Sequence, residues 1–120
     1  MESEDIHIRI GHSPDPDDAF MFHALTTGAM ETPGRHYEHV LLDIQTLNEK
    51  ALNSEYEISA VSIHSFPKII ENYALMNCGA SMGEGYGPML IGNEQLTSQE
   101  AKSRTIAVPG LDTSAYLALR

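Results

Sequence analysis

The sequence predicts an α/β protein whose β-sheet is mainly parallel and carries helices on both faces. Short runs of alternating apolar residues alternate along the chain with segments of helical periodicity, and the connections between them are short. The composition, with 42% apolar and 20% charged residues, is typical of a globular domain. At 120 residues the chain can form one small core, so we expect a single α/β lobe over 1–120.

The first strand is predicted at residues 6–10, where apolar and polar residues alternate. Two prolines punctuate the loop that follows. Asp17 or Asp18 can then cap a helix that runs through residues 19–25, and Gly28 ends it. This order of strand, loop and helix is the first unit of the predicted sheet.

A second strand is predicted at residues 37–42, and Asp43 stands before a helix over residues 44–52. The apolar stripe of this helix consists of Ile44, Leu47 and Ala51. A third strand is expected at residues 56–61 and a helix at residues 62–72.

The second half of the chain continues the alternation. Further strands are expected at residues 73–76, 88–92 and 105–109, a short helix at residues 97–103, and a final helix that begins near Thr113. The sheet would then have about five strands. No stop signal follows the final helix, so we expect the chain to be part of a longer protein.

Charge and composition exclude several classes of partner. The chain has 17 acidic and 7 basic residues, and a formal net charge of −10 disfavours nucleic acid and an anionic membrane surface. The single cysteine, Cys78, has no partner for an internal disulfide. The N-terminus is acidic where a signal peptide would be basic, and no run of about 20 apolar residues is present. These features predict a cytoplasmic protein.

In open α/β sheets, ligands bind where the carboxyl ends of strands lead into helices. Four such junctions are predicted, at residues 11–18, 61–65, 83–88 and 109–114. The last is the best candidate for an anion, because Thr113 and Ser114 place hydroxyls beside free backbone N–H groups at a helix start. Ser62 is a similar donor. The alternative is ordinary helix capping by Asp112 or Thr113.

The other polar residues at these junctions do not have the pattern of a metal site or a nucleotide-binding loop. Asp15, Asp17 and Asp18 lack the spacing of a metal site, so helix capping is the better explanation for at least one of them. His12 can titrate near neutrality, although a solvated loop histidine is commoner. The glycines at 83–87 lack the lysine of a phosphate-binding loop. We therefore predict neither metal nor cofactor.

Five segments in order resemble the 1,4-dihydroxy-6-naphthoate synthase family of the futalosine route to menaquinone. Residues 11–20, Gly-His-Ser-Pro-Asp-Pro-Asp-Asp-Ala-Phe, are similar to the Ser-Pro-x-Pro-Asn/Asp-Asp-x-Phe opening of that family. The likeness continues through residues 43–48, 59–62, 83–88 and 108–116, which together span nearly the whole chain. The Asp15 and Asp17 positions are often Cys and Asn in the family.

The resemblance implies a fold like that of type II periplasmic binding proteins, with a cleft between two lobes. It implies a carbon–carbon lyase that converts cyclic dehypoxanthinylfutalosine to 1,4-dihydroxy-6-naphthoate. Ser62, Ser114 and Ala115 match the positions that bind the substrate carboxylate, with Thr113 beside them. The catalytic histidine of the family lies beyond Arg120, so the second lobe and the catalytic group are expected outside this chain, and the fragment alone is expected to be inactive.

The resemblance also predicts how the site assembles. Residues 12–18, Ser62, residues 83–88 and residues 112–115 should converge on one edge of the sheet, with Ser13, Asp17, Gly85 and Gly87 in the loops of the cleft. Two alternatives share this fold: a solute-binding receptor, which would normally carry a signal peptide or lipid anchor, and chorismate dehydratase, whose opening motif differs from residues 13–18.

Overall fold

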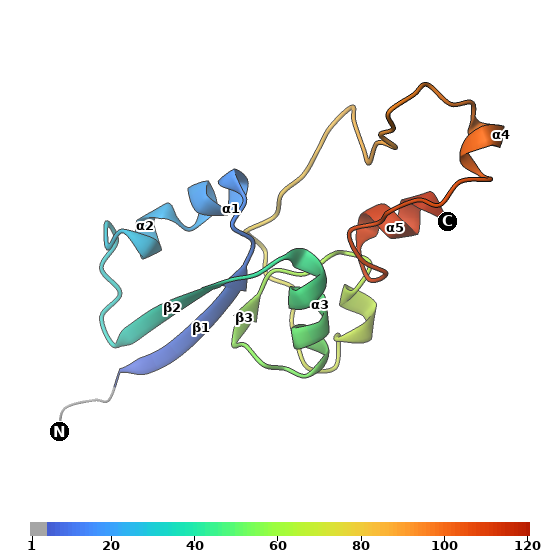
Figure 1. The fold of residues 1–120 in the computed structure, drawn as a ribbon. Helices are drawn as coiled ribbons and strands as arrows, with labels where there is room; N and C mark the ends of the chain where they lie inside the picture. Colours follow the sequence, from blue (N-terminus) through green and yellow to red (C-terminus); the bar gives the residue numbers. More distant parts are fainter. Residues whose placement is uncertain (1–4) are drawn as a thin grey trace.

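Three parallel strands form the sheet, in the order β2-β1-β3, in a computed structural model that describes residues 5–120 (Figure 1). They are β1 (Ile6–His12), β2 (Arg35–Leu41) and β3 (Ile58–Ser59). The central strand β1 pairs with β2 along its whole length but with β3 only at two positions. The prediction of an α/β protein with a parallel sheet is therefore confirmed, while the expected number of about five strands is wrong.

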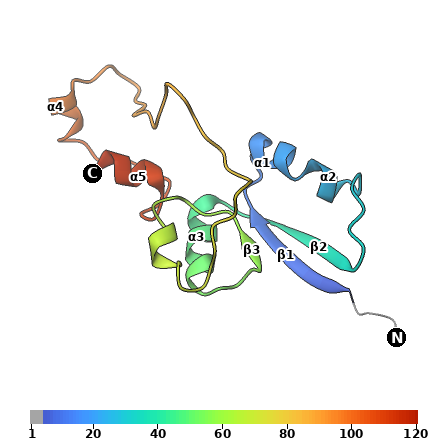
Figure 2. The same cartoon turned by 180° about the vertical axis from the view of Figure 1, so that it is seen from behind.

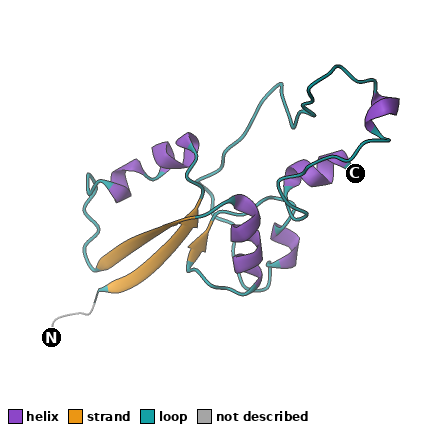
Figure 3. Ribbon diagram, in the orientation of Figure 1, coloured by secondary structure: helices purple, strands orange, loops and turns teal. Residues whose placement is uncertain are grey.

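The helices are short and separate the strands (Figure 3). They are α1 (Pro16–Met21), α2 (His23–Thr26), α3 (Ile44–Leu52), the 3₁₀ turn η1 (Phe66–Lys68), α4 (Ser98–Ala101) and α5 (Ser114–Leu119). None of the helices within residues 5–120 is long and apolar enough to cross a membrane.

Helices cover both faces of the sheet (Figures 1 and 2). Neighbouring residues of a strand point to opposite faces. A Cβ on Gly11 would lie 2.8 Å from Leu47 of α3, whereas the His12 ring lies 4.4 Å from that of Phe22, between α1 and α2. The α1/α2 segment therefore packs on one face of the sheet, and α3 packs on the other.

The buried apolar residues lie on both sides of β1, because Leu47 and Ala51 belong to α3, whereas Ile10 points to the same face as His12. The four buried apolar residues are Ile10, Leu47, Ala51 and Ile69. Gly11 is the point of closest approach, because any side chain there would collide with Leu47 and with the Tyr56 ring. A glycine in this strand therefore allows α3 to pack close to the sheet.

The helix over 44–52 was predicted with its correct bounds. Asp43 caps it, with its carboxylate accepting hydrogen bonds from the Thr46 N–H at 3.0 Å and the Thr46 hydroxyl at 2.6 Å. Hydrogen bonds from Thr46 lower the pKa of Asp43. A cap followed by an apolar stripe is a local signal, which is why the sequence located this helix so well.

The first helix differs from the prediction in its start and its continuity. Asp15, and not Asp17 or Asp18, occupies the N-cap, because Pro16 is fixed at the φ of a first helical residue. The helix then breaks at Phe22 into α1 and α2. Gly28 follows the end of α2 with φ +69, as expected for a glycine that terminates a helix.

Residues 56–72 form less regular structure than predicted. The strand expected at 56–61 pairs only at Ile58 and Ser59, and the helix expected at 62–72 is reduced to turns around η1. Pro67 accounts for the second difference, because it lacks the N–H that a helix over 62–72 would pair with the carbonyl of Ile63.

The strands expected at 73–76, 88–92 and 105–109 are absent from the described structure. All of these residues except Tyr73 belong to an arc, residues 74–109, that leaves the sheet and leads to α5 (Figure 3). The radius of gyration is 17.9 Å, against about 14 Å for a compact chain of this length. The apolar pattern is present in the arc, but no neighbouring strand pairs with it.

Candidate functional site

A buried asparagine joins α3 to the chain after β3. Asn48 is fully buried. Its Oδ1 accepts the Ser62 N–H at 2.8 Å, and its Nδ2 donates to the Ser62 hydroxyl at 3.1 Å and to the Asp112 carbonyl at 3.2 Å. Both N–H donors and the oxygen of the amide are thus used to bring the Ser62 loop and the start of α5 together.

Sequence reasoning missed the role of Asn48, although the signal was there. Asn48 lies beside Leu47 and four residues after Ile44, on the apolar stripe of α3. A polar residue at such a position has to find hydrogen-bond partners when the stripe is buried. Its side chain was therefore predictably engaged, but its partners are distant in sequence and could not be named.

The start of α5 is held by a threonine cap. The Thr113 hydroxyl accepts the Tyr116 N–H at 3.3 Å and donates to the Gly110 carbonyl at 2.8 Å. Thr113 is 3% exposed. Both functions of its hydroxyl are occupied within the protein, so Thr113 positions the helix start. Of the two residues predicted as caps, Thr113 is the one that caps.

Ser114, the first residue of α5, contacts the Ser62 loop. Its hydroxyl oxygen accepts the backbone N–H of His64 at 3.3 Å. The His64 ring completes this link, because its Nδ1 lies 3.1 Å from the Thr113 carbonyl, which can only accept. Ser62 and Ser114, predicted from separate junctions, therefore belong to one hydrogen-bonded cluster on the same side of α3.

Asp112 is bound in this cluster by its side chain as well as its backbone. Its carboxylate pairs with Lys68, and this hydrogen bond is the main cause that lowers the pKa of Asp112. Its N–H donates to Gln45 Oε1 at 3.1 Å, and its carbonyl also accepts the Ser65 hydroxyl at 2.8 Å. Asp112 is therefore a structural anchor, and the charge of Lys68 is neutralised.

The polar groups of the first loop are engaged away from the Ser62 cluster. The Ser13 N–H donates to Asp18 at 2.7 Å, and the Ser13 hydroxyl accepts the Asp15 N–H at 3.2 Å. A hydrogen bond from Ser81 is the main cause that lowers the pKa of Asp17. Ser13 thus orders the start of α1, while Asp17 contacts Ser81 of the segment after β3. No hydrogen bond within residues 5–120 connects Ser13 or Asp17 to the Ser62 cluster.

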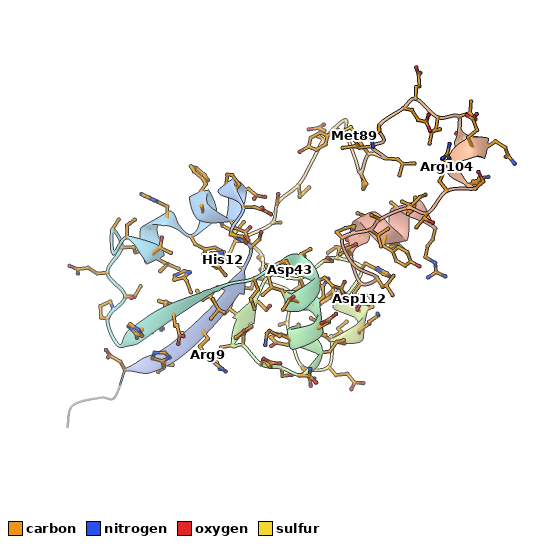
Figure 4. All side chains as sticks on the ribbon, in the orientation of Figure 1. Arg9, His12, Asp43, Met89, Arg104 and Asp112 are labelled. Carbon is orange, nitrogen blue, oxygen red and sulfur yellow. The ribbon has the colours of Figure 1, made fainter. Side chains whose placement is uncertain are left out.

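The structure does not bring the glycine loop to this cluster. Gly85 and Gly87 lie in the exposed arc, and Gly85 has φ +75, a conformation that favours glycine. Figure 4 shows Met89 on the arc, well away from Asp112 beside α3. Of the residues expected at one edge, Ser62 and those at 112–114 meet, and Ala115 follows them as the second residue of α5.

The arrangement can bind an anion through neutral donors. The oxygens of Ser62 and Ser114 each accept one hydrogen bond, so each hydroxyl retains a proton to donate. Within residues 5–120, no protein group accepts either proton and no group of three or more His, Cys, Asp or Glu side chains is placed to hold a metal ion. The cluster thus offers hydrogen bonds without a formal charge.

The sequence matches the model of a family described as menaquinone biosynthesis over residues 8–120. It is 35% identical over 112 residues to a 1,4-dihydroxy-6-naphthoate synthase from Thermus thermophilus, and 34% identical over 114 residues to the synthase from Streptomyces coelicolor. These alignments cover 93% and 94% of this chain but only 40% and 39% of the two synthases.

The fold is also shared with a protein of Archaeoglobus fulgidus solved by X-ray crystallography. The two chains are 47% identical and superpose with a TM-score of 0.65, over 72% of this chain and 32% of the other. Most of the described fold therefore has a crystallographic counterpart. The chain spans about two fifths of the length of the two synthases it matches.

Proposed function

We propose, from the premise that this chain belongs to the menaquinone biosynthesis family, that it supplies the carboxylate-binding part of a 1,4-dihydroxy-6-naphthoate synthase. The observation that carries the proposal is the pairing of Ser62 and Ser114 in one cluster, each with a hydroxyl proton left to donate. Two such donors fit the two oxygens of one carboxylate.

The electrostatics of the cluster favour a neutral clamp for this anion. Lys68, the cation that contacts the cluster, is already paired with Asp112. A carboxylate therefore meets hydroxyls, joined by the backbone N–H groups of Ser114 and Ala115 at the start of α5. Hydrogen bonds to a charged acceptor are about twice as strong as those between neutral groups, so a few well-placed donors suffice.

The proposed reaction is the lyase step that converts cyclic dehypoxanthinylfutalosine to 1,4-dihydroxy-6-naphthoate. In the proposed reaction, Ser62 and Ser114 bind the aromatic carboxylate and fix the orientation of the ring system. The group that abstracts the proton is the histidine expected beyond Arg120. The contribution of this chain is binding and orientation, which calorimetry can measure directly.

The test is titration of the chain with 1,4-dihydroxy-6-naphthoate, using 1,4-dihydroxynaphthalene as the matched ligand without a carboxylate. We expect the carboxylate to bind more tightly. Ser114→Ala should weaken its binding by about ten- to a hundredfold, because a hydrogen bond to a charged group contributes about 1.5–3 kcal/mol. The affinity for the diol should stay unchanged. Equal affinity of wild type and variant for the carboxylate would show that Ser114 is structural.

Thr113→Ala is the control variant, because it removes a cap and no free donor. It should lower the free energy of unfolding by about 1 kcal/mol, with a smaller change in affinity than Ser114→Ala. Thermal unfolding of both variants separates the two roles. A variant pair with the opposite pattern would place the ligand on Thr113.

The chain alone should form no 1,4-dihydroxy-6-naphthoate from cyclic dehypoxanthinylfutalosine, because the proton-abstracting histidine is expected elsewhere. Chromatography of the reaction mixture, with a complete synthase such as that of Thermus thermophilus as positive control, measures this. Product formed by the purified chain would show that the base lies within these 120 residues.

A further inference from the structure

Two histidines on adjacent strands form a hydrogen-bonded pair away from the serine cluster. His12 of β1 is 3% exposed, and its Nε2 lies 3.0 Å from Nδ1 of His39 of β2. The register pairs Ile10 with His39, so His12 and His39 are diagonal neighbours on one face of the sheet. Their rings meet edge to face, with centroids 5.2 Å apart.

The partners of this pair fix where its protons lie. His12 Nδ1 is 3.0 Å from the Ser13 carbonyl, which can only accept, so Nδ1 carries the proton. In the uncharged pair His12 Nε2 is then an acceptor, and His39 Nδ1 donates to it. His39 Nε2 is left with a lone pair. This atom is buried, and no group within residues 5–120 donates to it.

An unpartnered buried acceptor calls for an explanation, and the neighbouring cavity offers one. A cavity of about 320 Å³ lies between the sheet and the α1/α2 segment, and both histidines line it. Its walls are largely carbon, from Pro14, Ala19, Phe22 and Leu41. The Phe22 ring lies 4.4 Å from the His12 ring and 5.8 Å from the His39 ring, between centroids.

We propose that this cavity binds a small, uncharged aromatic molecule whose O–H or N–H group donates a hydrogen bond to His39 Nε2. The carbon walls and the Phe22 ring favour an aromatic body. Solvent does not reach Nε2. The ligand that carries the donor group must therefore displace the side chains that cover this atom. The site is independent of the proposed carboxylate clamp and has the opposite chemistry, since it accepts where Ser62 and Ser114 donate.

The charges around the pair exclude an anionic ligand. The Asp18 carboxylate lies 3.9 Å from His12 Nδ1, on the far side of the pair from the free acceptor. Burial, and then the proximity of His12, lowers the pKa of His39, so its Nε2 keeps the lone pair at neutral pH. A neutral imidazole nitrogen that carries a lone pair repels an anion but accepts a hydrogen bond from a neutral donor.

The test compares phenol, anisole and benzoate as probes of the whole chain by ¹H–¹⁵N NMR of the histidine rings. Phenol and anisole share a ring, but only phenol donates. We expect phenol to shift His39 Nε2 and to bind about two- to tenfold more tightly than anisole, the gain from one neutral hydrogen bond. Benzoate should not shift it. Equal binding of phenol and anisole, no binding of phenol, or tighter binding of benzoate would overturn the proposal.

Two variants on β2 complete the experiment. His39→Phe removes the acceptor and keeps a ring, so phenol should lose its advantage over anisole. His36→Phe makes the same change on the opposite face of the strand, and the preference for phenol should persist. The ¹⁵N shift of wild-type His39 decides the matter if His39→Phe does not fold: a protonated Nε2 in the free chain at neutral pH contradicts the proposal.

Discussion

Residues 5–73 and the arc of residues 74–109 carry similar apolar patterns but have different structures. All four buried apolar residues lie in the first region, and no residue from 74 to 109 is buried. In Figure 4 Arg9 and His12 lie on β1 and Asp43 lies at the start of α3, whereas Met89 and Arg104 stand apart on the arc. The two regions differ in structure because neighbouring strands and helices pack against the first region but not against the arc.

The comparison teaches that a strand is a property of a pair of segments. Residues 6–12 become β1 because β2 pairs with them at seven positions and α3 covers one face. Residues 88–92 have the composition of a strand, yet Met89 is 79% exposed and Ile91 is 85% exposed. Without a backbone partner, the cost of ordering such a segment is not offset by hydrogen bonds or burial.

The largest difference between the regions should appear on removal of an apolar side chain. Leu47→Ala empties a fully buried position of α3 and should lower the free energy of unfolding by about 2–5 kcal/mol. Ile91→Ala, in the arc, should change it by less than about 0.5 kcal/mol. Urea unfolding followed by circular dichroism measures both.

A volume-conserving control distinguishes packing from fold disruption in this experiment. Leu47→Met should cost less than about 1.5 kcal/mol, because the cavity is refilled. A loss for Ile91→Ala as large as that for Leu47→Ala would mean that the arc is packed in solution, and the comparison of the two regions would fail.

The same contrast explains which parts of the fold the sequence could predict. Signals that act within one turn of chain were sufficient where they were read: Asp43 caps the helix predicted after it, and Gly28 ends α2. The helix expected at 97–103 is shorter, Ser98–Ala101, because Thr97 is its cap and not its first residue. The strands at 73–76 and 105–109 depended on partners that apolar alternation cannot supply. Their prediction failed for that reason.

The candidate site follows the same division. Ser62 and Ser114 were predicted as donors because they follow strand ends, which is a local pattern. Asn48, which connects them, and Lys68, which neutralises Asp112, act across 14 to 64 positions of sequence. Contacts of that range arise from packing, so the sequence could indicate the donors but not the framework that holds them.

Removal of a helix cap should lower stability by an intermediate amount, and by different amounts in the two regions. Asp43→Ala removes two hydrogen bonds to Thr46 at the start of α3, and should cost about 1 kcal/mol of global stability because α3 packs on the core. Thr97→Ala removes the capping box of the four-residue α4 in the arc. We expect that loss to remain local, as faster hydrogen exchange of the Glu100 amide without a change in global unfolding.

Asp43→Asn is the matched control, because it keeps an acceptor at the cap and should retain most of the stability. Equal global losses for Asp43→Ala and Thr97→Ala would contradict the comparison, since α4 would then unfold together with the core.

The smallest difference in stability should come from the removal of one ion pair in each region. Arg9 of β1 donates to both carboxylate oxygens of Glu57, at 2.9 and 3.1 Å, and its backbone N–H adds a third bond at 2.8 Å. These hydrogen bonds lower the pKa of Glu57 from its usual 4.5 to about 2. In the arc, Arg104 makes a single contact of 3.0 Å with Glu94, and both side chains are more exposed than those of Arg9 and Glu57.

The depressed pKa of Glu57 determines the sign of the pH dependence. The unfolded chain protonates Glu57 near pH 4.5 and the folded chain only near pH 2, so the stabilisation is complete above 4.5 and is lost as the pH falls from 4.5 towards 2. The Glu57 side chain is 45% exposed, which limits the contribution to about 0.2–1 kcal/mol. Glu57→Gln should therefore slightly lower the free energy of unfolding at about pH 7, and its difference from the wild-type value should narrow at about pH 3.

Glu94→Gln should have no measurable effect on the free energy of unfolding at either pH. Urea unfolding at the two pH values, with ¹³C NMR titration of the Glu57 carboxyl, measures both quantities. A Glu57 pKa that stays near 4.5, or a gap that does not narrow, would mean that the Arg9–Glu57 pair is solvated as fully as the one in the arc.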